Sequence, residues 1–120
     1  EPTNTPFSRL IFKHIHHEQF DEKKDSWQVN GKGRMADANL AMPWAIFSRD
    51  KKKFLVKYPD LEILQNNKHT PFRWFLSGGM AYRQFVPSAS FGFFTNTEKI
   101  LSPFHNILGS FMTIVIKKSE

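Results

Sequence analysis

Phe111-Met112-Thr113-Ile114-Val115-Ile116-Lys117 is the stretch that decides the fold of this chain. It is rich in β-branched residues and apolar at nearly every position, which is typical of a strand buried on both faces of a sheet. One other segment, Leu61–Gln65, alternates in the way a strand does. Because two strands seldom stand alone in water, the sequence predicts a sheet that is incomplete in this chain.

Helix-start and helix-stop signals divide the rest of the sequence. Thr5-Pro6 combines a favourable N-cap with proline at the first helical position, and apolar residues follow at helical spacing to about residue 17. Similar signals predict three further helical segments: 49–58 with Ser48 as its cap, a segment from Thr70-Pro71 to Gly78-Gly79 that resumes over 80–86, and 97–108 with Thr97 as its cap, a restart at Pro103 and an end at Gly109.

Several segments are expected to be irregular. Gln19–Arg34 is polar and carries a run of charges, so it is expected to be a loop insertion with Trp27 as its anchor. Ala38–Met42 is expected to form a helical turn, and 44–47 an extended entry to the next helix. Two shorter segments complete the set, a turn at Asn66-Asn67 and a loop at Ser88–Asn96.

Composition bounds the function. The 120 residues are expected to form one domain, or a fragment of one, spanning 1–120. The absence of cysteine excludes disulfides, thiolate metal sites and a cysteine nucleophile. No run reaches the roughly 18 apolar residues of a membrane span, and no signal peptide is visible, so a cytoplasmic protein is expected. Because Glu1 is not an initiator methionine, a piece of a longer protein is also expected.

The densest group of titratable side chains is His14-Ile15-His16-His17-Glu18. Its spacings of three and four place side chains on one helical face, from which zinc can be bound, but the His-Glu-x-x-His order of zinc proteases is absent. Histidine also suits acid–base work on a substrate, because its pKa lies near neutrality. The alternative is a polar helix end packed under the following loop.

Three other features are open to more than one interpretation. Gly78-Gly79 with Arg83 could hold an anion, or could be a helix end beside a surface arginine. Lys51–Lys53 could contact nucleic acid, or could be a solvated face. The aromatic residues could line an apolar substrate pocket or form plain core: Trp44, Trp74, Phe75, Tyr82 and Phe85.

Taken in order, several short motifs resemble a known family. They are His16-His17-Glu18-x-Phe20-Asp21, Ala38–Trp44, Arg49-Asp50, Tyr58–Ile63, Leu76–Gly79 with Arg83, and the closing Phe111–Ile116. Together they cover nearly the whole chain and resemble the C-terminal portion of bacterial class I S-adenosylmethionine-dependent methyltransferases. Each motif alone is moderately specific, and their order and spacing carry the resemblance.

The resemblance implies an α/β fold, the C-terminal part of a doubly wound sheet with two strands forming an antiparallel end and several helices. Glu1-Pro2 would follow the fifth of seven strands. Leu61–Gln65 would be the sixth, and Phe111–Lys117 the seventh, inserted between the fifth and the sixth. That insertion would explain a seventh strand buried on both faces.

The resemblance also implies a function divided between two halves. The glycine-rich loop and the acidic residue that hold S-adenosylmethionine belong to the first strands of the family, and neither is present here. The chain alone is therefore expected to bind no cofactor and to be inactive, while the full-length enzyme uses S-adenosylmethionine. The substrate side would remain, with His16, His17 and Glu18 as catalytic residues and Asn39, Trp44, Tyr82 and Arg83 as substrate-binding residues.

Two other functions compete with this interpretation. A free-standing binding module would use the aromatic pocket and basic surface for an anionic or apolar small ligand. A nucleic-acid binder would use its dispersed positive charges, which no recognised motif accompanies: Lys51–Lys53, Lys68, Arg73 and Arg83. The expected partners are a small-molecule substrate or an N-terminal methyltransferase half, and the isolated chain is expected to form homo-oligomers through its open strand edges.

Overall fold

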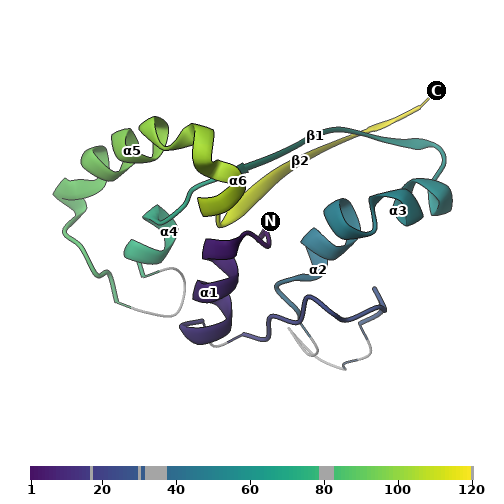
Figure 1. Cartoon of the computed structure of the whole chain (residues 1–120), viewed down its shortest axis with the longest axis horizontal. Coiled ribbons are helices and arrows are strands. Elements are labelled where there is room, and N and C mark those ends of the chain that lie inside the picture. The colour runs from purple at the N-terminus through teal and green to yellow at the C-terminus, as the bar shows by residue number, and fades with distance from the viewer. Residues whose placement is uncertain (17, 30, 32–37, 79–82, 120) are drawn as a thin grey trace.

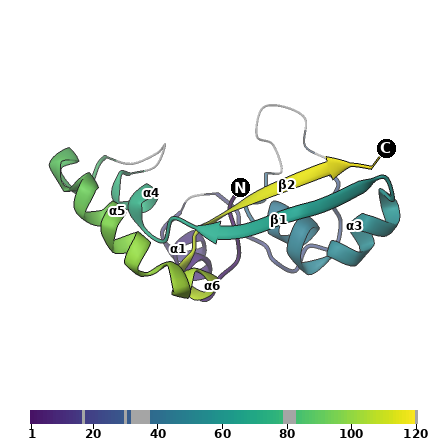
Figure 2. The ribbon, with the colours of Figure 1, turned by 90° about the horizontal axis from the view of Figure 1, so that it is seen from above.

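The computed structural model describes residues 1–16, 18–29, 31, 38–78 and 83–119. These residues form a two-stranded antiparallel sheet with several helices around it (Figure 1). Seen from above, α5 and α6 lie toward one end of the sheet and α3 toward the other (Figure 2). The elements in chain order are α1 (Pro6–His14), α2 (Met42–Trp44), η1 (Ala45–Arg49), α3 (Lys51–Lys57), β1 (Leu61–His69), α4 (Arg73–Leu76), η2 (Ser88–Ser90), α5 (Phe91–Ile100), η3 (Ser102–Phe104), α6 (His105–Leu108) and β2 (Phe111–Lys118).

The sheet pairs β1 with β2 over their whole length, from Leu61 opposite Lys118 to His69 opposite Phe111. Both predicted strands are confirmed, and β1 is longer than expected. The turn predicted at Asn66-Asn67 is wrong, because both residues continue β1. The Asn66 Nδ2 donates instead to the Phe47 carbonyl at 3.1 Å and to the Ser48 hydroxyl at 3.0 Å, so the amide nitrogen, though not the buried Oδ1, is bonded in mid-strand.

The first residues of the chain lie along the other edge of β2. The Met112 amide donates to the Glu1 carbonyl at 2.7 Å, and the Glu1 ammonium donates to the Met112 carbonyl at 3.0 Å. The Thr3 amide donates to the Ser110 carbonyl, which completes an antiparallel bridge between Pro2 and Phe111. Because backbone groups alternate between the two edges of a strand, Met112 bonds Glu1 on the edge opposite β1.

The expectation that β2 is buried on both faces is wrong for this chain. Met112 is fully buried, but Val115 and Ile116 expose 38% and 40% of their surface. The reason is the width of the sheet. Beyond Met112, β2 has β1 on one edge and no strand on the other among the described residues. The apolar sequence of β2 is therefore typical of a strand with more neighbours than the described residues provide.

The predicted start of α1 is confirmed in detail. The Thr5 hydroxyl accepts from the Ser8 amide at 3.1 Å, and the Ser8 hydroxyl accepts from the Thr5 amide at 2.7 Å, which is a reciprocal capping box. Pro6 follows at the first helical position. The helix ends at His14, with Ile15 as its C-cap, about three residues earlier than predicted.

The segment 42–57 is a nearly continuous helical run, which corrects two expectations. Residues 44–47 are helical and not extended, and Pro43 lies in the first turn of α2, where it breaks no hydrogen bond. Ser48 lies inside the π-helical turn η1 and does not cap a helix. Its hydroxyl contacts the Met112 sulfur at 4.0 Å and so joins this run to β2.

The short helix α4 begins later than predicted. Thr70 has a positive φ of 49° and is not its N-cap, which is Phe72. The cap comes from a distant residue, because one carboxylate oxygen of Glu98 accepts from the amides of Phe72 and Arg73 at 3.0 and 2.7 Å. The helix ends at Leu76 with Ser77 as its C-cap, and Gly78, near the predicted end, follows with a left-handed φ of 85°. Of the resumed helix expected over 80–86, residues 80–82 lie outside the described residues and 83–86 are not helical.

Much of the loop expected at Ser88–Asn96 is helix. α5 begins at Phe91 and runs through Thr97, whose hydroxyl donates to the Phe93 carbonyl inside the helix and caps nothing. The restart near Pro103 and the end at Gly109 are confirmed. No helix formed by the described residues is both long and apolar enough to cross a membrane.

Candidate functional site

The end of α1 lies in a cluster of aromatic rings. The His16 ring stacks on Trp74 with 5.5 Å between centroids, and Phe12 packs against both Phe20 and Trp74 at 5.4 and 6.2 Å. Phe111, the first residue of β2, contacts Trp74 at 5.2 Å. The cluster therefore joins α1, α4 and β2, and His16 is half-buried at its margin.

Hydrogen bonding orients the His16 ring. Its Nδ1 accepts from the Glu18 amide at 3.2 Å. A nitrogen that accepts a hydrogen bond carries no proton, so the neutral ring holds its proton at Nε2. The sequence named His16 and Glu18 as separate catalytic candidates, and in the structure the Glu18 backbone amide contacts the His16 ring.

Asn39 lies beside the same cluster and holds the chain that leaves it. Its Oδ1 accepts from the amides of Asp21 and Ala41 at 2.9 and 3.0 Å, and its Nδ2 donates to the Asp21 carbonyl at 2.8 Å. The side chain is buried, and all of these bonds go to backbone. Asn39 therefore fixes the position of the segment after Phe20, which packs on Phe12.

The other predicted site residues are not all brought together. Trp44 is half-buried in α2, and Arg83 is exposed on the segment after α4. His17 and Tyr82 lie outside the described residues. The structure thus groups His16, Glu18 and Asn39 around one aromatic cluster. It also groups no set of three His, Asp or Glu side chains, within the described ranges, that could hold a metal ion.

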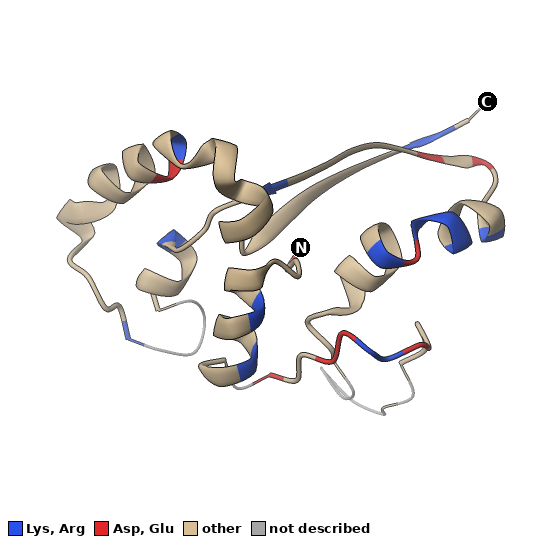
Figure 3. Ribbon diagram, in the orientation of Figure 1, with Lys and Arg blue, Asp and Glu red and all other residues tan. Residues whose placement is uncertain are grey.

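The expected loop insertion is held on α3 by more than Trp27. The Trp27 indole donates to the Asp50 carboxylate at 3.0 Å, while the Arg49 guanidinium donates to the carbonyls of Glu22 and Lys24 at 2.6 and 3.0 Å. Arg49 and Asp50 also form an ion pair at 2.7 Å. The hydrogen bond from Arg49, with a smaller contribution from Trp27, lowers the pKa of Asp50 to about 2 despite opposing desolvation. Figure 3 shows that α3, where the loop is anchored, is also rich in Lys.

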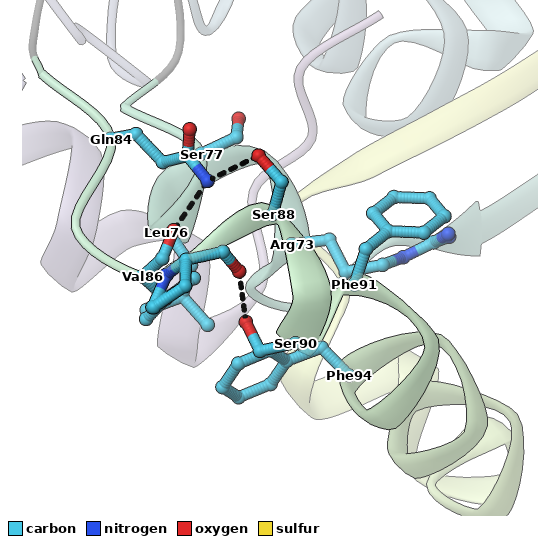
Figure 4. Close-up of a pocket in the computed structure, with 10 residues that line it drawn as sticks. Arg73, Leu76, Ser77, Gln84, Val86, Ser88, Ser90, Phe91 and Phe94 are labelled. Carbon is cyan, nitrogen blue, oxygen red and sulfur yellow. Dashed lines mark hydrogen bonds between the residues drawn. The ribbon is translucent and has the colours of Figure 1, made fainter.

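Sequence reasoning missed a pocket beside α4. It has a volume of about 450 Å³, and apolar side chains from α4, the following loop and α5 form much of its lining: Leu76, Val86, Pro87, Phe91 and Phe94. Arg73 lies at its edge with the guanidinium 5.5 Å from the Phe91 ring centroid (Figure 4). The only sequence signal was the aromatic content of Ser88–Asn96, a segment predicted to be a loop.

Arg73 is held in place by Glu98. The Arg73 Nε donates to the second carboxylate oxygen of Glu98, and its Nη1 donates to the Thr95 hydroxyl at 3.3 Å. Glu98 is only 3% exposed, so the ion pair and the two backbone amides satisfy a buried charge. This arrangement fixes α4 against α5 and sets the shape of the pocket.

Comparisons of the chain with protein-family models, with curated proteins and with solved structures found no match. The functional argument therefore rests on the sequence motifs and on the geometry of the described residues.

Proposed function

We propose that this chain is the substrate-side, C-terminal part of a cytoplasmic S-adenosylmethionine-dependent methyltransferase. One observation carries the proposal. β2 lies between β1 on one edge and Glu1–Thr3 on the other. The family resemblance implies this order for its sixth strand, its seventh strand and the end of its fifth.

The direction of the pairing adds support. Glu1 lies opposite Met112 and Thr3 opposite Ser110, so the two segments run antiparallel. Residues preceding Glu1 would continue along Thr113–Lys118, the part of β2 that has no second neighbour among the described residues. A preceding strand would also cover Val115 and Ile116, which are apolar and partly exposed.

Two described segments, one after β1 and one before β2, do not offer close backbone approach to a cofactor. The segment after β1 is Thr70-Pro71-Phe72, with no glycine to allow close approach of a ligand to the backbone. Gly109 is closely packed, since a Cβ there would lie 2.7 Å from the His105 carbonyl oxygen. We therefore assign no step of methyl transfer to S-adenosylmethionine bound by these residues.

The role proposed for this chain is to position the methyl acceptor. The stack on Trp74 and the bond from the Glu18 amide to Nδ1 fix the orientation of the His16 ring, which we propose lies against the methyl acceptor. Acting as a base through Nε2 would require the other tautomer and loss of the Glu18 amide bond. The stacked Trp74 and the Asn39 contacts hold this region in one geometry, which is how binding energy is converted into alignment.

The experiment is a cofactor titration of the native gene product. We expect a protein with about 100 further residues before Glu1, the size of a common domain, that binds S-adenosylmethionine in calorimetry while the 120-residue chain does not. In that protein, His16→Ala should lower kcat at least tenfold, with His14→Ala, an exposed residue of α1, as the control. A native product that starts near Glu1, or a longer one that binds no cofactor, would contradict the proposal.

A further inference from the structure

A second, polar pocket lies next to the apolar pocket of Figure 4. It has a volume of about 350 Å³. Hydrogen-bond donors and cations are prominent in its lining: Arg73, Thr95, Lys99, Ser102 and His105. The single acid in the lining is Glu98, whose carboxylate is already bonded to Arg73 and to two backbone amides. Its oxygens therefore point toward partners within the protein.

Helix α5 joins the two pockets. Phe91 and Phe94 line the apolar pocket, and Thr95, Glu98 and Lys99 line the polar one, so the lining changes character along the helix. Arg73 belongs to both linings. Its side chain lies beside Phe91 (Figure 4). Its Nη1 also donates to the Thr95 hydroxyl one turn further along α5, so Arg73 lies between the two pockets.

The polar pocket carries excess positive charge. The charges of Arg73 and Glu98 cancel in their ion pair, which leaves the Lys99 ammonium. No acidic residue in the described ranges forms an ion pair with Lys99. His69, which lines the pocket, is subject to the same excess of positive charge. Burial lowers its pKa, and the positive charges of the amino terminus, His105 and Arg73 lower it further, while Glu98 opposes them.

We infer that the two pockets form one binding site for an amphipathic oxyanion. Its anionic head lies in the polar pocket near Lys99 and Ser102, and its apolar part lies against Phe91 and Phe94. Charge and shape complementarity select this ligand class, since neither a purely apolar nor a purely anionic molecule uses both pockets. The inference concerns binding by this chain and does not depend on the proposed methyl transfer.

The test is a calorimetric titration of the 120-residue chain with three probes, hexyl phosphate, inorganic phosphate and 1-hexanol, at pH 7.5. We expect hexyl phosphate to bind at least about tenfold more tightly than either of the others, because only it fills both pockets. Hexanoate and hexyl sulfate, titrated in parallel, distinguish a carboxylate head from a tetrahedral one.

Two variants separate the two pockets, and each has a matched control. Lys99→Ala should weaken hexyl phosphate and inorganic phosphate alike by about fivefold, whereas Lys51→Ala, an exposed lysine of α3, should change neither. Phe91→Ala should weaken hexyl phosphate alone, whereas Phe93→Ala, on the same helix and in neither lining, should not. All four side chains are exposed, and circular dichroism verifies that each variant is folded.

Three results would overturn the inference. The first is that hexyl phosphate binds no more tightly than 1-hexanol, which would mean that the polar pocket does not bind the phosphate group. Another is equal effects of Lys99→Ala and Lys51→Ala, which would indicate a diffuse electrostatic attraction. The third is equal effects of Phe91→Ala and Phe93→Ala, which would indicate adsorption to exposed aromatic rings.

Discussion

Both halves of β2 contain large apolar residues, but their surroundings differ. At Phe111 and Met112 the strand has β1 on one edge and Glu1–Thr3 on the other, and Met112 is fully buried. At Val115 and Ile116 the strand keeps β1 but has no second neighbour within the described residues, and both side chains are about two-fifths exposed. The difference shows that burial along β2 follows the number of neighbouring strands and not the apolar character of the strand alone.

The largest expected effect is the contrast between Met112→Ala and Ile116→Ala. Met112→Ala removes a fully buried side chain and leaves a cavity, so it should lower the free energy of unfolding by about 3 kcal/mol. Ile116→Ala removes a partly exposed side chain and should cost less than about 1 kcal/mol. Urea denaturation monitored by circular dichroism measures both. Equal losses would mean that the two halves of β2 are packed alike.

The buried half is also tied to α1, which Thr5→Ala tests. The Thr5 hydroxyl accepts from the Ser8 amide and donates to the Gly109 carbonyl at 2.8 Å, just before β2. Losing the helix cap and the bond to Gly109 should lower the free energy of unfolding by about 1–2 kcal/mol. Thr97→Ala is the control, since its hydroxyl only bonds back to its own helix and its loss should cost less than about 0.5 kcal/mol. A Thr5 variant as stable as the Thr97 variant would show that the link contributes nothing.

The helical run beside the open half supplies a pH-dependent prediction. The pKa of Asp50 lies below its ordinary 3.8, at about 2. The ionised carboxylate therefore stabilises the folded chain fully well above pH 3.8, and this stabilisation is lost as the pH falls through about 2. Because the carboxylate is partly solvated, we expect it to contribute about 1 kcal/mol to the free energy of unfolding. Asp50→Asn should be less stable than the parent at pH 6, and the gap should narrow at pH 2.5. An unchanged gap, or an equal effect of the exposed control Asp60→Asn, would contradict this assignment.

The smallest effect on the monomer, and a large one on association, is expected from Ile116→Pro. The Ile116 amide faces the edge opposite β1, as the Met112 amide does, so proline there removes no bond to β1. We expect the parent chain to form dimers or larger species at micromolar concentration through this edge, and the variant to be monomeric in light scattering. A monomeric parent would remove the open edge as an association surface.

Local signals predicted α1 and β2 because their causes are local. Thr5-Pro6 caps its own helix, and the β-branched run of β2 has one regular conformation available. Pro43 shows the limit of such reasoning. From the sequence, this proline is expected to interrupt a helix. In the structure it lies in the first turn of α2, where proline is favourable.

The remaining misses have long-range causes. Asn66 is a residue type common in turns, yet it continues β1, where its side-chain nitrogen donates to Phe47 and Ser48. Thr70 reads as a cap, yet Glu98 caps α4 from 26 residues away. Of the site, the sequence named His16 and Glu18 as catalytic residues and Asn39 as a substrate-binding residue, and these three roles stay predictions. It named Arg73 only among dispersed positive charges and missed its ion pair with Glu98 and the two pockets, because a buried ion pair between distant residues leaves no local pattern.

Amide hydrogen exchange in β2 tests the central claim most directly, that this strand lies in the interior of a larger methyltransferase sheet. In the 120-residue chain, the Met112 amide is bonded to Glu1 and should be protected, while the Ile114 and Ile116 amides face the open edge and should exchange quickly. In the native gene product, we predict that the Ile114 and Ile116 amides become as protected as that of Met112. Fast exchange of both amides in the native product would contradict the claim.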